Sequence, residues 1–377
     1  MRTVFVFFAG NERGGAAAHI NTLARTVVRF GNPSRYRFVS LGSGPLADTL
    51  SKTDVRMHRI EGGTLAAVSQ LRQLLQTERE VLLHAHGPRM NILAALATRR
   101  HRVPWTSTIH SHPAYDFLGS SLKSRLYPKL HMWSLKQAMG LFIVQSSLAE
   151  VLPTRTVLDV PNAVDLPPLS RGRAECAALW RDRLGIAQDA RLIGVAARFD
   201  PVKNLDVLIR AMARLQTQNA HLLLAGDGEM RQSLEQLAVR EGVADRVHFL
   251  GFLSGMADFY GAIEIHVLPS KSEGTPFCIL EAGTYGAANI GSDIPGLRAL
   301  LKDGRAGVLT PVGDAGALAT DMDTLLQRED ERTRYVNAFS QLVLPDFAPQ
   351  KMLEAYERGY TVLEEDILRF RQFTRSS

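Results

Sequence analysis

The 377-residue chain is predicted to fold as two α/β domains, each a doubly wound sheet of parallel strands. Short β-rich runs alternate with longer helical stretches, which is typical of parallel α/β proteins. The alternation pauses once, at "VPNAVDLPPLSRG" (160–172), and then starts again. A chain of this length, 45% hydrophobic and 22% charged, also exceeds what one core usually holds.

The first domain is expected over residues 1–164. "TVFVFFA" at 3–9 opens it as an apolar strand. Helical stretches are predicted at 16–30, 64–78 and 88–99. The other expected strands are 36–41, 55–60, 80–85, 105–109, 140–145 and 155–160. Three prolines, Pro161, Pro167 and Pro168, discourage helix after them and mark a connector.

The second domain is expected over residues 165–345, followed by a helical segment over 346–377. Its predicted strands are 192–197, 221–226, 247–251, 264–270, 287–292 and 306–310, each followed by a helix candidate. In such sheets, ligands collect at the carboxyl ends of the strands. The loops that follow strands are therefore where chemistry is expected.

Charge and composition narrow the class of protein. The net charge of +6 conceals 20 basic and 9 acidic residues in 1–160, against 24 and 29 in 161–377. A basic first half could attract an anionic acceptor or membrane surface, whereas no nucleic-acid-binding signature accompanies it. Two cysteines, Cys176 and Cys278, are too few for a disulfide framework. Apolar runs are far shorter than the roughly 20 residues that span a bilayer, and no signal peptide is recognised, so a cytoplasmic protein is expected.

The stretch "KSEGTPFCILEAG" (271–283) carries the first candidate site. It joins a strand to a helix for which Thr275 would be the N-cap and Pro276 would lie in the first turn. Such a helix start attracts phosphate, whereas Glu273 and Glu281 would accept hydrogen bonds from hydroxyl groups. A nucleotide sugar offers both. The alternative is a pair of solvated charges.

A second stretch, "GVAARFDPVKNLDVLIRAMARL" (194–215), places Arg198 after a strand and Lys203 before a helix. Two cations of these types could neutralise a leaving diphosphate. The alternative is that both are solvated surface residues.

These stretches, with "LLLAGDGEMRQSLEQLA", "VHFLG" and "DIPGLRALLKDGRAGVLTPVGD", resemble in order and spacing the retaining glycosyltransferases of family 4. The resemblance continues more weakly in the first half through "ERGGAAAHINTLA", "LLHAHG", "TSTIHSHP", "IVQSS" and "VPNAVD". It implies the GT-B fold, two Rossmann-like domains facing across a cleft. The second domain would hold the nucleotide sugar and the first domain the acceptor. The segment 346–377 would cross back to the first domain.

The resemblance also implies roles for single residues. Glu273 would contact the donor sugar, Glu281 the ribose, and Arg198 and Lys203 the diphosphate. The backbone cradle would be formed by Gly274, Thr275, Pro276 and Phe277. The first domain would approach the phosphates through Gly14 and Gly15. His110 would lie near the sugar. Asn162 matches a hinge-side asparagine of the family.

The implied reaction moves a sugar from a nucleotide diphosphate sugar to an acceptor hydroxyl with retention of configuration. It needs no metal and no bound cofactor, and UDP sugars are favoured over GDP sugars. Many members of the family build cell-surface polysaccharide or glycolipid on lipid-linked acceptors at the inner face of the cytoplasmic membrane. Basic residues in two windows, 99–102 and 123–129, would suit an anionic membrane surface, or else a soluble anionic acceptor; they are Arg99, Arg100, Arg102, Lys123, Arg125 and Lys129.

Departures from the family pattern leave alternatives open. Ala299 stands where the family often has glutamate, and "TYGAANIGS" (284–292) replaces a more usual stretch. A nucleotide-sugar 2-epimerase of the same fold and a non-catalytic nucleotide-sugar-binding protein therefore remain alternatives.

Three further signals are interpreted as structural. The histidines His84, His86, His110 and His112 are expected to form a polar cleft wall rather than a metal site. "DMD" (321–323) is expected to be a solvated helix face, and the glycines of "AGDGEM" lack the full dinucleotide-binding pattern.

Overall fold

The computed structural model describes residues 1–99, 103–110, 122–144, 146–153, 156–253 and 255–376. The chain forms two compact units. Unit 1 comprises residues 1–163 and 347–377, and unit 2 comprises residues 164–346. Both are α/β, which confirms the predicted fold class.

In its described residues, unit 1 has a seven-stranded parallel sheet in the order β3-β2-β1-β4-β5-β6-β7. The strands are β1 (Thr3–Ala9), β2 (Tyr36–Leu41), β3 (Met57–Ile60), β4 (Val81–His86), β5 (Trp105–Ile109), β6 (Leu141–Ile143) and β7 (Val157–Asp159).

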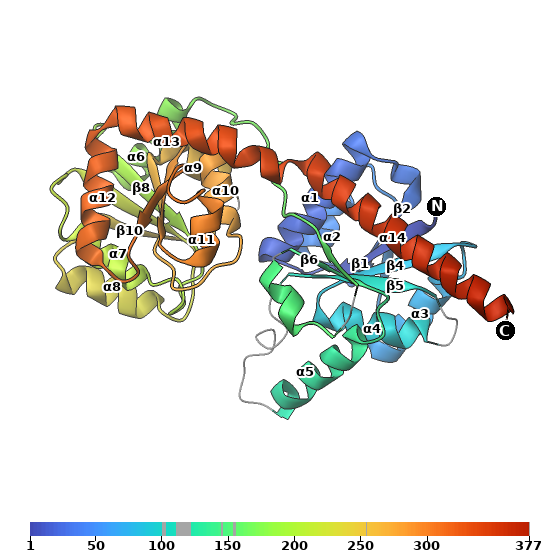
Figure 1. The fold of residues 1–377 in the computed structure, drawn as a ribbon. Helices are drawn as coiled ribbons and strands as arrows, with labels where there is room; N and C mark the ends of the chain where they lie inside the picture. The colour runs from blue at the N-terminus through green and yellow to red at the C-terminus, as the bar shows by residue number, and fades with distance from the viewer. Residues whose placement is uncertain (100–102, 111–121, 145, 154–155, 254, 377) are drawn as a thin grey trace. The chain divides into compact units, whose positions relative to one another are not determined.

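Helices cover both faces of this sheet. Successive side chains of β1 point to opposite faces, and both sets are apolar and buried. Val4, Val6 and Phe8 pack in one core and Phe5 and Phe7 in the other. Figure 1 shows the long C-terminal helix α14 (Pro349–Ser376) running beside α1 (Gly14–Phe30). The other helices of unit 1 are α2 (Pro45–Leu50), α3 (Thr64–Leu75), α4 (Pro88–Thr98) and α5 (Leu122–Leu135), with 3-10 turns at Pro33–Arg35 and Ser146–Val151.

In its described residues, unit 2 has a six-stranded sheet in the order β10-β9-β8-β11-β12-β13. The strands are β8 (Arg191–Ala196), β9 (Ala220–Ala225), β10 (Val247–Gly251), β11 (Ile265–Leu268), β12 (Ala288–Ser292) and β13 (Val308–Thr310). The helices are α6 (Arg173–Leu184), α7 (Leu205–Met212), α8 (Arg231–Arg240), α9 (Ala257–Ala262), α10 (Phe277–Thr284), α11 (Pro295–Leu300), α12 (Ala315–Gln327) and α13 (Glu329–Leu342), and a 3-10 turn at Leu344–Phe347 follows them.

The strand order reverses direction once in each sheet, beside β1 and β4 in unit 1 and beside β8 and β11 in unit 2. The crevice at the carboxyl ends of such strand pairs is where doubly wound sheets bind ligands. The loops after β8 and β11 contain Arg198, Lys203 and Glu273. The predicted donor residues therefore lie at the position where this topology favours a ligand.

Candidate functional site

Three loops of unit 2 are tied together at the carboxyl ends of its central strands. The backbone N–H of Lys271, after β11, donates to Val202 O at 2.8 Å, after β8. Phe199 N donates to Asp227 O at 2.9 Å, which joins the loop after β8 to the loop after β9. A Cβ on Gly228 would lie 2.5 Å from Phe199 O, so only glycine permits this approach. Backbone hydrogen bonds therefore fix the loops of the candidate site relative to one another.

Glu273 and Lys203 form an ion pair within this frame. Lys203 Nζ donates to Glu273 Oε1 at 2.6 Å, and Ser270 Oγ donates to the same oxygen at 2.6 Å. The Glu273 side chain is only 9% exposed and that of Lys203 20%. Ser270 is fully buried. The sequence predicts both charged residues but not Ser270, whose only signal is its position directly after a strand.

Gly296 in α11 packs closely against the backbone of Glu273. A Cβ on Gly296 would lie 2.2 Å from Glu273 O and 2.8 Å from Gly274 O. The first turn of α11 therefore packs directly on the loop that presents Glu273. Ala299, the position that departs from the family pattern, is exposed on the same helix.

The start of α10 differs from the expectation. The helix begins at Phe277, with Pro276 in extended conformation as its N-cap. The predictions that Thr275 is the N-cap and that Pro276 lies in the first turn are therefore both wrong. Proline disfavours helical conformation in the residue before it, which keeps Thr275 outside the helix. Among the described residues, no side chain caps the first turn of α10. Its backbone N–H groups are therefore not covered by a capping side chain, as an anion site requires.

Glu281 lies one turn into α10 and is largely buried. Tyr260 in α9 donates its hydroxyl to Glu281 Oε2 at 2.9 Å. Burial raises the pKa of Glu281 above its ordinary value of 4.5, and the Tyr260 hydrogen bond opposes that rise in part. Tyr260 was not predicted, because nothing in its spacing from Glu281 indicates a contact.

Arg198 does not join this cluster. Its side chain is 84% exposed and pairs with Asp200 at 3.0 Å. The guanidinium therefore extends into solvent beside the site, whereas Lys203 is already held by Glu273.

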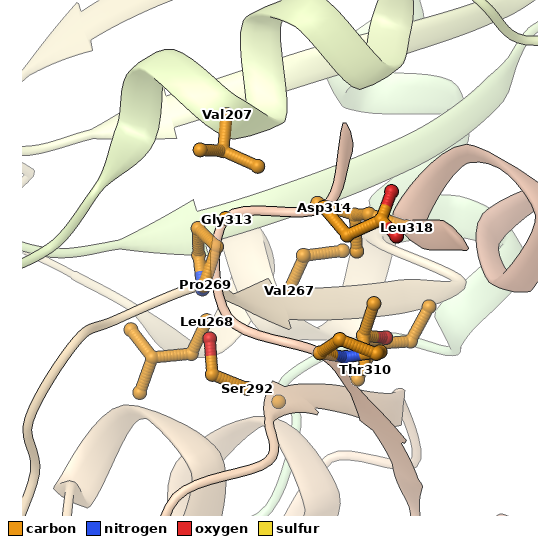
Figure 2. Close-up of a pocket in the computed structure, with 12 residues that line it drawn as sticks. Val207, Val267, Leu268, Pro269, Ser292, Thr310, Gly313, Asp314 and Leu318 are labelled. Carbon is orange, nitrogen blue, oxygen red and sulfur yellow. The ribbon is translucent and has the colours of Figure 1, made fainter. Parts of the chain in front are cut away.

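A small hollow lies beside these loops, at the carboxyl ends of β11, β12 and β13 (Figure 2). Leu268, Ser292, Thr310, Gly313 and Asp314 are among its lining residues. Its volume is about 10 Å³, enough for about one water molecule. It is too small for a nucleotide sugar, and none of the predicted site residues lines it.

Unit 1 contains a larger pocket, at the carboxyl ends of β1, β4 and β5. Its volume is about 180 Å³, and Glu12, Gly87, Asn91, His110 and His131 are among its lining residues. Burial raises the pKa of Glu12. The pocket lies at the switch point of this sheet, so it is the candidate site of unit 1.

Gly14 and Gly15 begin α1 and are both exposed. Gly14 has φ +67°, a left-handed conformation that favours glycine, and a Cβ there would meet no atom of the described residues within 4 Å. The backbone at this helix start is therefore accessible.

Of the four histidines expected to form a polar cleft wall, His110 lines the unit 1 pocket, whereas His84 and His86 are buried inside the unit. His84 is fully buried, with Nδ1 2.7 Å from the Tyr360 hydroxyl and Nε2 2.8 Å from Thr108 Oγ1. His86 is buried and stacks on it with ring centroids 4.7 Å apart. The cleft-wall interpretation is therefore wrong for His84 and His86, because α14 covers this face of the sheet and places Tyr360 against His84. His112 lies outside the described residues.

His19, on α1, joins the same network and was not predicted from the sequence. Its Nδ1 is 3.0 Å from Asn162 Oδ1, and its Nε2 is 2.7 Å from the Tyr356 hydroxyl. Because the asparagine oxygen only accepts, His19 Nδ1 carries the proton and Tyr356 donates to Nε2. The Thr108 hydroxyl, 2.8 Å from Tyr356, then donates to Tyr356.

The donor and acceptor roles of the remaining hydrogen bonds follow from this assignment. Thr108 accepts from His84 Nε2, and Tyr360 donates to His84 Nδ1. Every member then has a partner with both histidines neutral. Burial agrees with this, because it lowers the pKa of His19 to about 4 and that of His84 to about 3. Asn162 is one end of this buried chain of hydrogen bonds.

The "DMD" stretch is also not a solvated face. Asp323 is buried and accepts from the backbone N–H groups of Gln216 and Thr217, both at 2.9 Å. Asp321 accepts from the Thr310 hydroxyl at 2.5 Å. Helix α12 therefore places Asp323 where it accepts from two backbone N–H groups, and Asp321 where it accepts from a side chain of β13.

Of the basic windows in unit 1, the described part shows Arg99 and Lys129 exposed. Arg100 and Arg102 lie outside the described residues, as do residues 111–121 between the windows. No helix in the described ranges is both long and apolar enough to cross a membrane.

Comparison with known proteins agrees with this architecture. Residues 177–341 match the family "Glycosyl transferases group 1", and residues 14–164 match the "Glycosyl transferase 4-like domain". The lipopolysaccharide core biosynthesis glycosyltransferase LpsE of Rhizobium meliloti is 29% identical over 185 residues, which cover 49% of this chain and 54% of LpsE. The match therefore spans about half the length of that relative.

Other relatives match over most of the chain. N-acetyl-alpha-D-glucosaminyl L-malate synthase of Bacillus anthracis is 25% identical over 309 residues, 80% of each chain. The crystal structure of Anabaena Alr3699/HepE in complex with UDP and glucose superposes with a TM-score of 0.80 and 17% identity, covering 96% of this chain and 100% of that one. The two family matches and the paired Rossmann-type sheets place the chain among the glycosyltransferases of the GT-B fold and family 4 type.

Proposed function

We propose that the chain transfers a sugar from a nucleotide diphosphate sugar to an acceptor hydroxyl with retention of the anomeric configuration. The observation that carries the proposal is the Lys203–Glu273 ion pair at the switch point of unit 2, directly before the uncapped start of α10. A cation, a carboxylate and backbone N–H groups are placed together where a phosphate and a hydroxyl-rich group would both find partners.

Departure of the diphosphate is assisted by positive charge. Lys203 Nζ is a donor that can turn from Glu273 toward phosphate oxygens, and the start of α10 adds the partial charge of its first N–H groups. The exposed guanidinium of Arg198 reaches the outer phosphate. Groups already oriented toward the developing charge stabilise it without reorganisation.

Glu273 binds the donor sugar rather than attacking it. Among the described residues, both hydrogen bonds to its carboxylate go to Oε1, so Oε2 is the atom that accepts from a sugar hydroxyl. The acceptor then attacks on the face from which the diphosphate departs, through an oxocarbenium-like state. Glu281, held by Tyr260, accepts from the ribose hydroxyls.

The donor is a UDP sugar, and neither a metal ion nor a bound cofactor takes part. The UDP and glucose named with HepE support the base. Metal independence is supported by the cations Arg198 and Lys203. Turnover should survive 5 mM EDTA, and loss of activity that Mg²⁺ or Mn²⁺ restores would contradict it.

The acceptor binds in the pocket of about 180 Å³ in unit 1, where His110 and Glu12 offer polar groups. The lipopolysaccharide named for LpsE supports a role in cell-surface glycan synthesis and a lipid-linked acceptor. The net charge of +11 over residues 1–160 would hold the protein on an anionic membrane, because each basic residue contributes about 1 kcal/mol there.

Flotation with phosphatidylglycerol vesicles and with neutral phosphatidylcholine vesicles tests the membrane role. The protein should float with the anionic vesicles only, and not in 1 M salt, where the Debye length is about 3 Å. Replacing Arg99, Arg100 and Arg102 together by serine should weaken flotation. Equal failure with both vesicle types would favour a soluble anionic acceptor.

The central experiment measures donor binding and turnover separately. Calorimetry should detect binding of UDP but not of GDP. Chromatography should show that UDP is released from UDP sugars when a glycan acceptor is added. Glu281→Gln should weaken UDP binding, whereas Glu273→Gln should lower turnover more than UDP affinity. Release of a free 2-epimer without an acceptor would indicate an epimerase, and binding without any turnover a binding protein.

A further inference from the structure

His110 is contacted by a second buried histidine. His86 Nδ1 lies 3.2 Å from His110 Nε2, with the rings stacked at 29° and their centroids 5.5 Å apart. His86 ends β4, and His110 follows β5, the next strand of the sheet. The contact therefore joins two rigid strand ends at the rim of the unit 1 pocket, which His110 lines.

This hydrogen bond contains one proton. Burial and the neighbouring histidines lower the pKa of both His86 and His110, so both rings are neutral near pH 7. In a neutral pair, one ring nitrogen donates and the other accepts. Two arrangements are possible, with the proton on His86 Nδ1 or on His110 Nε2.

The other nitrogen of His86 distinguishes the two arrangements. His86 Nε2 is buried and has no hydrogen-bond partner among the described residues. If His110 donated, His86 would carry its proton on Nε2, and a buried N–H would lack an acceptor. If His86 donates, Nε2 is a bare lone pair. Orphaned N–H groups are rarer in proteins than under-satisfied acceptors, so the second arrangement is favoured.

We propose that His86 is a positioning residue that donates its Nδ1–H to His110 Nε2 and thereby keeps the proton of His110 on Nδ1. The proposal rests on the proposed function only in assuming that His110 contacts a substrate. The lone pair of Nε2 is then occupied by His86, and Nδ1 carries a hydrogen. His110 consequently acts as a hydrogen-bond donor to a substrate oxygen and cannot serve as a general base.

The stacking of His86 on His84 supports this role. The rings are nearly parallel, at 13°, and His84 is itself fixed by Tyr360 and Thr108. His86 is thus held in a single orientation by a neighbour that cannot turn. A positioning residue needs such support to hold its partner's tautomer.

Histidine tautomers can be measured without an activity assay. Long-range ¹H–¹⁵N spectra of the ¹⁵N-histidine-labelled protein, with His110 assigned from the His110→Asn spectrum, should show His110 protonated on Nδ1. A wild-type spectrum with the proton on Nε2 would overturn the proposal. This measurement needs no variant of His86, so it stands even where such a variant folds poorly.

Two substitutions of His86 separate donation from packing. His86→Asn places an amide near the position of Nδ1 and should keep the His110 tautomer, whereas His86→Leu should shift it toward Nε2–H. The kcat of His86→Leu should fall at least about tenfold below that of His86→Asn, because a displaced donor loses its transition-state hydrogen bond. An unchanged His110 tautomer in His86→Leu would contradict the proposal.

The pair His221 and His248 in unit 2 provides a matched control. This second histidine pair lies away from the predicted site residues, and His221 Nδ1 is 3.0 Å from His248 Nε2. His221→Leu should leave both the His110 tautomer and kcat unchanged. Failure of the proposed function would appear as no transfer by the wild-type protein, which is distinct from a wrong tautomer.

Discussion

Lys203 donates from Nζ to Glu273 Oε1 across 2.6 Å, although the two residues lie 70 positions apart in the chain. Each comes from a loop that follows a central strand of unit 2, and a backbone hydrogen bond between Lys271 and Val202 joins those loops. The ion pair therefore belongs to the frame of the site as well as to its chemistry. Its removal should affect both stability and turnover.

The first prediction concerns stability. Lys203→Ala leaves the carboxylate of Glu273, only 9% exposed, without its cation. The free energy of unfolding should fall by about 3 kcal/mol, the lower end of the range for a broken buried pair, because Lys203 is partly exposed. Urea unfolding followed by circular dichroism measures it.

The control for this prediction is Arg210→Ala, which breaks a half-exposed helical pair with Asp206 and a longer contact with Glu241. It should cost about 0.5 kcal/mol or less. The double variant Lys203→Met with Glu273→Gln should recover part of the lost stability, because no unpaired charge remains. Equal costs for Lys203→Ala and Arg210→Ala would show that the pair is not structural.

The second prediction concerns pH. Burial raises the pKa of Glu281, so between its unfolded value near 4.5 and its folded value the native state binds more protons than the unfolded state. This contribution to stability is present below pH 4.5 and is lost as the pH rises through the folded pKa. Glu281→Gln removes it. The free energy of unfolding of the variant, relative to wild type, should increase from pH 4.5 to pH 7.

Urea unfolding at several pH values tests this prediction. The comparison is made between pH values, so a constant packing cost of the amide cancels. Glu235→Gln, on the exposed face of α8, is the control and should show no such trend. A flat difference for Glu281→Gln would mean that this carboxylate pays no desolvation cost. UDP binding should weaken in the same variant, so the two readouts move in opposite directions.

The third prediction tests the buried network of unit 1. Tyr356→Phe removes the hydroxyl that joins His19 Nε2 and Thr108 Oγ1, at 2.7 and 2.8 Å. His19 is then left with a buried, unpaired nitrogen, which should cost about 1–3 kcal/mol. Tyr360→Phe removes one contact, to His84, and should cost less. Tyr335→Phe, on α13 of unit 2, should change stability by less than about 0.5 kcal/mol.

Thermal and urea unfolding of the three variants give the order of the costs. A Tyr356→Phe protein as stable as Tyr335→Phe would show that the hydroxyl network does not contribute. Because the network ends at Asn162, the same variant should also change the backbone amide resonances of Asn162 and Ala163.

The sequence predicts the fold well where burial alone decides it. Strands 3–9, 36–41, 105–109 and 247–251 are predicted to the residue. The first of them is an apolar run of strand length bounded by Arg2 and Gly10. The strand predicted at 264–270 is too long, since β11 ends at Leu268. Pro269 cannot donate to the ladder, and Ser270 turns away to hydrogen bond with Glu273.

The candidate site is predicted in residue type but not in contacts. Glu273 and Lys203 follow from strand-end position and charge, yet their pairing depends on how two loops meet. The sequence around Tyr260 and His19 does not indicate their contacts, because each lies among apolar residues on a helix face that the sequence assigns to the core. The same limit explains Asp323, whose backbone partners lie more than a hundred residues away in the chain.

The last prediction concerns Gly296, the residue of α11 that supports the Glu273 loop. In Gly296→Ala, the new Cβ would lie 2.2 Å from Glu273 O, closer than any real contact, and that neighbour is backbone. The loop must therefore move, and Glu273 with it. We expect kcat for sugar transfer to fall about 100-fold, comparable to a misplaced reacting group, with a smaller change in UDP affinity.

Gly255→Ala is its control, because a Cβ there would meet nothing within 4 Å. It should leave both kcat and UDP affinity unchanged. The two variants add the same methyl group to the same unit, so a difference between them reports on the loop and not on composition. Equal kcat in Gly296→Ala and wild type would show that the position of Glu273 tolerates this displacement. The carboxylate would then have no part in orienting the donor sugar.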